Sequence, residues 1–202
     1  MSATVPAPTA AFVLHLEQAV WLVLPVLIAG LIHIAVIRLD LLPALGRWPL
    51  DGSLTFRGRR LLGRNKTVRG ALAMMVTTPL VTALLAHTCA ATQTRLAVAA
   101  LQVGHPWAWG LLLGTGYCIG ELPNSFLKRQ LGIAPGAIAS GVRGAIFWVT
   151  DQLDSVAGVL VALSSAWRPN LAVVACIVAL ALLLHPLVAA LMVMLRLKDR
   201  IG

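Results

Sequence analysis

Four stretches of this sequence each run for 20 residues or more without a single Asp, Glu, Lys or Arg. Because an α-helix rises about 1.5 Å per residue, about 20 apolar residues are enough to cross the hydrocarbon core of a bilayer. A fifth stretch of similar length is interrupted only by Asp151 and Asp154. The uninterrupted stretches cover residues 18–37, 70–94, 96–120 and 169–195, and the interrupted one covers residues 144–167.

The composition excludes the soluble classes of protein. Of the 202 residues, 59% are hydrophobic and only 11% are charged, whereas soluble domains, disordered chains and coiled coils need far more charge. We therefore predict an all-α integral membrane protein, a single domain over residues 1–202 that bundles about five transmembrane helices. The expected spans lie near residues 16–38, 70–92, 105–127, 145–167 and 170–195, with cytoplasmic loops at 39–69 and 128–144.

Basic residues gather on one side of this predicted bundle. Fourteen of the sixteen Lys and Arg residues fall between the first two spans, between the third and fourth, or after the fifth. Short loops rich in these residues stay in the cytoplasm, so we expect the N-terminus outside, the C-terminus inside and the protein in the cytoplasmic (inner) membrane. The segment before Glu17 contains no base, unlike a signal peptide, so we expect the first span to be retained. Attraction of residues 57–69 to anionic lipid would explain that basic loop without any further function.

Acidic residues within the spans need a sharper explanation. A charged side chain near a helix centre costs about 2.5 to 3.5 kcal/mol to insert, so it must face protein, water, a metal or a base. Asp151 and Asp154 are three residues apart and share one helix face. Glu121, Ser125 and Lys128 follow i, i+4, i+7 spacing and also point one way. We expect the two faces to meet near the cytoplasmic surface.

The segment LLGRNKTVRGAL, residues 61–72, lies at the cytoplasmic mouth of the second span. Thr67 can cap that helix, and free backbone N–H groups at a helix N-terminus bind phosphate. Lys66 and Arg69 would add positive charge beside it.

Carboxylates, hydroxyls and cations at one depth suit magnesium and a nucleoside triphosphate, because Mg²⁺ prefers a few carboxylates together with phosphate oxygens. The spacing leaves one simpler alternative open. The same residues could form internal ion pairs, such as Glu121 or Asp151 with Arg69 or Lys128, that only neutralise one another.

Four segments then resemble one family in their order along the chain. They are LLGRNKTVRG (61–70), GELPNSFLKRQLGIAPG (120–136), DQLDSVAG (151–158) and HPLVAALMVMLRLKD (185–199). Together they are similar to the ordered motifs of the CDP-archaeol synthases, short relatives of the CDP-diacylglycerol synthases.

The resemblance implies a CTP-dependent transfer of a cytidylyl group to a membrane lipid phosphate, either phosphatidic acid or an archaetidic-acid-like ether lipid, with release of pyrophosphate. The implied partners are therefore CTP, the lipid phosphate and the bilayer, and the implied cofactor is Mg²⁺. The expected catalytic residues are Asp151, Asp154, Glu121 and Lys128, and the first three of these are the expected metal ligands. The expected substrate-binding residues are Asn65, Lys66, Thr67, Arg69, Ser125, Lys128 and Arg129.

The sequence departs from the family pattern at one corner. Glu121 stands where the family usually has Asp, and Pro123 with Asn124 replaces small apolar residues. A lipid-phosphate-binding relative without turnover therefore stays open as an alternative, as does a transporter or flippase, because intramembrane acids also line permeation paths.

Two further expectations concern partners. The sequence contains no recognisable nucleic-acid-binding module, so we expect none to bind. Two GxxxG spacings, Gly110 with Gly114 and Gly116 with Gly120, favour close packing of helices within one chain and leave a homodimer as the alternative.

Overall fold

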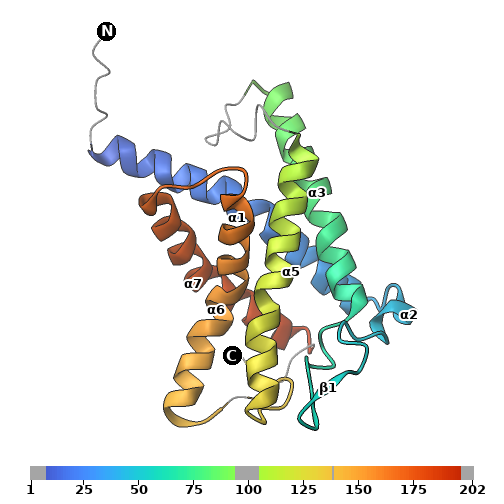
Figure 1. Cartoon of the computed structure of the whole chain (residues 1–202). Coiled ribbons are helices and arrows are strands. Elements are labelled where there is room, and N and C mark those ends of the chain that lie inside the picture. The colour runs from blue at the N-terminus through green and yellow to red at the C-terminus, as the bar shows by residue number, and fades with distance from the viewer. Residues whose placement is uncertain (1–7, 94–104, 138, 197–202) are drawn as a thin grey trace.

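The computed structural model describes residues 8–93, 105–137 and 139–196. Five long helices make up most of this part of the chain, one over each segment that the sequence marks as a span (Figure 1). They are α1 (Pro8–Arg38), α3 (Val68–Ala91), α5 (Pro106–Gln130), α6 (Gly141–Ser164) and α7 (Leu171–Met194). Three of the bases counted above, Arg95, Lys198 and Arg200, lie outside the described residues.

Four of these helices, α1, α3, α6 and α7, are long and apolar enough to cross a membrane. The chain is thus an integral membrane protein, and the prediction of about five spans is matched for four of them. The helix that falls short is α5, which carries several polar side chains in its last three turns. It packs against α3 on one side and α6 on the other (Figure 1).

Short elements occupy the loop between α1 and α3. In the sequence this region was recognisable only as a basic loop. A single turn, α2 (Pro43–Gly46), is followed by the antiparallel strands β1 (Thr55–Phe56) and β2 (Arg59–Arg60). The two residues between the strands, Arg57 and Gly58, have φ values of 52° and 74°, which is the left-handed backbone that a two-residue hairpin needs.

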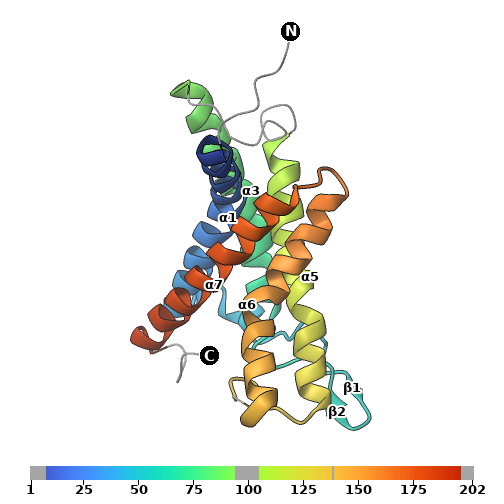
Figure 2. The same ribbon diagram turned by 90° about the vertical axis from the view of Figure 1, so that its left-hand side faces the viewer.

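The hydrophobic core lies at one end of the bundle. It takes residues from all five long helices, namely from the first half of α1, the last turns of α3, the start of α5, the end of α6 and the start of α7. Its buried members are Ala19, Leu22, Cys89, Trp109, Leu113, Val159, Leu163, Val173 and Ile177. From this end α1 and α7 run side by side and diverge from α5 and α6 towards the end that carries the hairpin (Figure 2). Polar residues are therefore expected to collect at that second end.

Glycines let α5 approach both of its neighbours. A Cβ atom added at Gly114 would lie 3.0 Å from the backbone oxygen of Met74 in α3. One added at Gly120 would lie 2.9 Å from the Cα atom of Gly158 in α6. Contacts this close leave little room for a side chain at either position. Both GxxxG spacings are therefore used within the chain, as the sequence favoured.

Asp51 organises the loop that carries the hairpin. One of its oxygens accepts hydrogen bonds from the backbone N–H of Ser53 (3.0 Å) and from the Arg60 guanidinium (2.6 Å), and the other accepts from the N–H of Leu62 (2.9 Å). Burial alone would raise the pKa of this carboxyl, since its side chain is 1% exposed. The bonds from Arg60 and the two N–H groups outweigh burial and hold the pKa below its usual value.

Asp51→Asn is therefore expected to lower the melting temperature at neutral pH, because charge-assisted bonds of this kind contribute about 1.5–3 kcal/mol. A depressed carboxyl pKa stabilises the fold fully above the unfolded value of 3.8 and stops doing so as the pH falls through the folded value. The melting temperatures of the wild type and the variant, measured in detergent by circular dichroism, should converge once the pH is below the pKa of Asp51 in the folded protein. Asp40→Asn, whose side chain is 73% exposed, is the control and should change little. A constant difference at every pH would contradict the assignment.

Candidate active site

The two aspartates of α6 meet one amide of α5. Asn124 is 5% exposed, and its Nδ2 donates to Asp151 Oδ1 at 2.6 Å and to Asp154 Oδ2 at 2.7 Å. The second Asp154 oxygen accepts the backbone N–H of Ser155. Two carboxylates one helical turn apart are thus held beside each other on the α5 side of α6.

Lysines neutralise the carboxylates around this pair. Lys128 of α5 donates to both oxygens of Asp151 and also lies 5.4 Å from the ring centroid of Phe147. Lys66, from the loop before α3, forms an ion pair with Glu121 of α5. Three elements therefore bring their charged residues to one cluster, which we call the carboxylate cluster: Lys66, Glu121, Asn124, Lys128, Asp151 and Asp154.

The row of α5 that faces this cluster differs slightly from the predicted one. Sequence spacing grouped Glu121 with Ser125 and Lys128, whereas the structure uses Glu121, Asn124 and Lys128. Both i+3 and i+4 neighbours lie beside a given helical residue, so spacing alone could not choose between them. Asn124 stood out in the sequence only as a departure from the family pattern, and it is the residue that joins the aspartates.

A divalent cation could bind this cluster only if enough carboxylate or amide oxygens can reach it. Across the described ranges, no three His, Cys, Asp or Glu side chains converge as a metal site, and Glu121 is paired with Lys66. Asp151 and Asp154 do converge on Nδ2 of Asn124. The Oδ1 of the same amide is buried without a hydrogen-bond partner, and it would join the two carboxylates around an ion if the amide turned over. Two carboxylates and one uncommitted amide oxygen are the hard donors that Mg²⁺ prefers. These residues therefore fit the cation.

The three residues of the NKT segment, 65–67, have different positions in the structure. Thr67 caps α3, its hydroxyl accepting the N–H of Gly70 at 3.3 Å. Lys66 joins the carboxylate cluster, whereas Asn65 is exposed. The Arg69 guanidinium turns away, towards Asp40 (2.7 Å) and the carbonyl oxygen of Leu41 (3.2 Å). Of the two cations predicted at this mouth, the structure places one at the carboxylates and pairs the other with a largely exposed loop residue.

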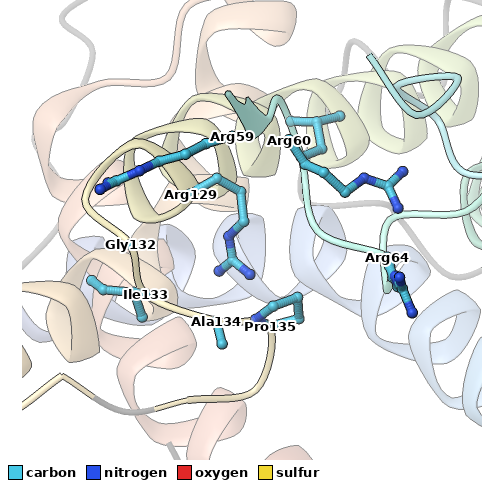
Figure 3. A pocket seen from close by; sticks show the side chains of 9 residues that line it. Arg59, Arg60, Arg64, Arg129, Gly132, Ile133, Ala134 and Pro135 are labelled. Atoms are coloured by element: carbon cyan, nitrogen blue, oxygen red, sulfur yellow. The ribbon is translucent and has the colours of Figure 1, made fainter. Parts of the chain in front are cut away.

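Arg129 also separates from its neighbour Lys128. Rather than at the aspartates, its guanidinium lies beside the α5 end, where four guanidinium groups line a cavity of about 540 Å³ (Figure 3). The other three come from the hairpin and the segment after it: Arg59, Arg60 and Arg64. In the sequence these three arginines indicated only which side of the membrane the loop occupies. Nothing in their spacing shows that the hairpin folds them onto α5.

Comparison with known proteins adds an independent finding. A family model described as CarS-like, CDP-archaeol synthase, matches residues 12–201. The CDP-archaeol synthase of Methanopyrus kandleri is 33% identical over 191 residues, covering 92% of this chain and 93% of that protein. The CDP-archaeol synthase of Aeropyrum pernix is 35% identical over 177 residues, covering 85% of this chain and 83% of that protein.

A solved structure is also similar in fold. It is described as an intramembrane enzyme for archaeal membrane lipids biosynthesis, and it superimposes with a TM-score of 0.57 at 28% sequence identity. The match covers 86% of this chain and 92% of that one. The similarity therefore extends through most of the membrane bundle.

Proposed function

Because this chain belongs to the CDP-archaeol synthase family, we propose that it transfers the cytidylyl group of CTP to the phosphate of an ether-linked, archaetidic-acid-like membrane lipid. The family assignment confirms the resemblance of the sequence motifs, and with it a nucleotidyltransferase of membrane lipid biosynthesis that uses CTP. The structural observation that carries the proposal is the meeting of Asp151, Asp154 and Asn124 between two lysines at the hairpin end of the bundle.

The proposed reaction needs no covalent intermediate with the protein. An oxygen of the lipid phosphate attacks the α-phosphorus of CTP, the bond from that phosphorus to the bridging oxygen breaks, and pyrophosphate leaves. Two polyanions must be brought together, so positioning and charge neutralisation supply the rate. Lys66 and Lys128 are placed for this task, since each can exchange its carboxylate partner for a phosphate oxygen. The ion pairs that the sequence left open as an alternative would then be the state of these residues before substrate binds.

Magnesium is the proposed cofactor. Asp151, Asp154 and the Oδ1 of Asn124 would hold the ion, with Glu121 beside them. Such an ion supplies charge neutralisation to phosphate oxygens when it is bound.

The membrane orientation expected from the basic loops is part of this proposal. With the hairpin and the ends of α5 and α7 in the cytoplasm, CTP reaches the carboxylate cluster from water while the lipid chains stay in the bilayer. In this arrangement α5 crosses the membrane with its polar row turned to α6.

One assay tests the proposed reaction. Purified protein in detergent is incubated with labelled CTP, MgCl₂ and either an ether-linked archaeol phosphate or phosphatidic acid. We expect CDP-lipid and pyrophosphate in equal amounts, formed faster from the ether lipid. Faster reaction with phosphatidic acid would reassign the lipid, and no product from any lipid phosphate would leave the binding or transport alternatives.

Metal binding can be measured without turnover. We expect Mn²⁺, added as a spectroscopic substitute for Mg²⁺, to bind the wild-type protein. Binding is measured as a decrease in the EPR signal of free Mn²⁺. Asn124→Leu should weaken this binding about tenfold, because it removes the uncommitted oxygen while keeping a similar volume. The exposed Asn65→Leu is the control and should bind Mn²⁺ as the wild type does. Equal Mn²⁺ affinity of all three proteins would place the ion elsewhere.

A further inference from the structure

The arginine cavity at the end of α5 is built to receive an anion. Four guanidinium groups line it, and none of its lining residues is acidic. The Nε and Nη1 atoms of Arg129 and the Nε atom of Arg60 are buried without hydrogen-bond partners. Buried donors of this kind cost free energy unless a ligand or water satisfies them. The unused donors point to phosphate, which guanidinium groups bind with several hydrogen bonds at once.

A second, apolar hollow of about 730 Å³ adjoins the arginine cavity. It lies between the hairpin loop and α5, and its walls are mostly aliphatic and aromatic. Its principal lining residues are Leu50, Leu54, Leu61, Ile119, Leu122 and Phe126. Asp51 also borders it, but its carboxylate is already occupied by Arg60 and two backbone N–H groups. We call this hollow the apolar groove.

The groove and the cavity follow one another along α5. Leu62 lines both of them. Ile119, at the membrane end of the groove, is 58% exposed, and Phe126 lies two turns further towards the hairpin end. Arg129 comes next on the same side of the helix. A path along α5 thus passes from an exposed apolar surface to buried, unpartnered guanidinium groups.

We propose that the apolar groove and the arginine cavity together bind the anionic lipid substrate, with its phosphate at Arg129 and Arg60 and one hydrocarbon chain along Leu122 and Phe126. The charge complementarity and the order of the two hollows match a lipid whose chain remains in the membrane. This assignment rests on the proposed function for the identity of the lipid as a substrate.

The same two segments connect this site to the carboxylate cluster. Arg129 follows Lys128 directly, and Arg64 precedes Lys66 by two residues. In each segment one cation faces the cavity (Figure 3) and the other faces a carboxylate. A phosphate held by the arginines is therefore bound by the segments that also carry both lysines of the cluster.

Photocrosslinking tests the site without requiring turnover. The full-length protein in nanodiscs is mixed with phosphatidic acid that carries a diazirine in one acyl chain, irradiated and analysed by peptide mass spectrometry. We expect crosslinks in residues 119–126 and 50–62. Arg129→Gln should reduce them about tenfold, and Leu54→Asp, at a 63% exposed position of the groove, should reduce them independently. Arg57→Gln, a hairpin arginine that lies over the Phe56 ring and outside the cavity, is the matched control and should label like the wild type.

The possible outcomes separate this site from the alternatives. Crosslinks confined to α1 and α7 would overturn the assignment, as would equal labelling by a diazirine phosphatidylcholine. Loss of labelling when CTP or pyrophosphate is added would assign the cavity to the nucleotide's phosphates instead. Labelling at the groove by a protein that makes no CDP-lipid would support the site and contradict the proposed function, whereas CDP-lipid formation without such labelling would do the reverse.

Discussion

Asp151→Asn is expected to reduce the rate of CDP-lipid formation by about 10²–10³-fold, the loss typical of removing one group that stabilises charge in a transition state. The Asp151 carboxylate contacts Lys128 through both oxygens and Asn124 through one. An amide keeps the shape of the side chain but loses its negative charge, so it can neither hold Mg²⁺ well nor orient the lysine. The rate is measured with labelled CTP, and the fold is checked by circular dichroism.

A matched control separates catalysis from folding in that experiment. Glu17→Gln also removes one carboxylate from a helix, but Glu17 lies near the start of α1, at the end of the bundle that carries the hydrophobic core. Its rate should equal that of the wild type. If Asp151→Asn instead lowers the melting temperature while the remaining folded protein keeps its full rate, Asp151 is only the partner of a structural ion pair.

Gly120→Ala is expected to damage both stability and activity. A methyl group at this position would meet the Gly158 Cα atom at 2.9 Å and its backbone nitrogen at 3.0 Å. Backbone atoms cannot move aside as a side chain does, so α5 and α6 must separate at a cost of about 1–3 kcal/mol. Asn124 lies one turn further along α5, and its bonds to the two aspartates would be lost with that separation. We expect a lower melting temperature and little remaining CDP-lipid formation.

Gly30→Ala provides the comparison for that variant. Gly30 lies within α1, and a Cβ atom there would meet nothing within 4 Å. The same substitution in another membrane helix should therefore leave the melting temperature and the rate unchanged or slightly improved. Equal behaviour of the two alanine variants would show that the crossing of α5 and α6 tolerates a side chain at Gly120.

The sequence alone predicted the helices and the meeting of two charged faces, for a clear physical reason. Apolar length and the cost of burying charge in lipid act on each segment separately, so they can be read without knowing the fold. Asp151, Asp154 and Lys128 were selected on this basis, and the structure brings them together.

Partner choice was less predictable, because it depends on the rotation of one helix against another. The close contact at Gly120 sets which row of α5 faces α6, so Asn124 rather than Ser125 reaches the aspartates. Arg69 was expected at the phosphates, but a loop residue, Asp40, holds it. The arginine cavity depends on the hairpin, whose two-residue strands carry too little periodicity to be recognised.

The placement of donors before acids along the chain has a consequence for biogenesis. Lys66, Asn124 and Lys128 all precede Asp151 and Asp154, so translation delivers the neutralising groups first. Alone in lipid, the two aspartates would cost about 5–7 kcal/mol to insert. Since α5 is already synthesised when α6 leaves the ribosome, α6 can enter the membrane against a partner that satisfies its carboxylates. A circular permutant beginning with α6 should therefore insert poorly, even though its finished fold would contain the same contacts.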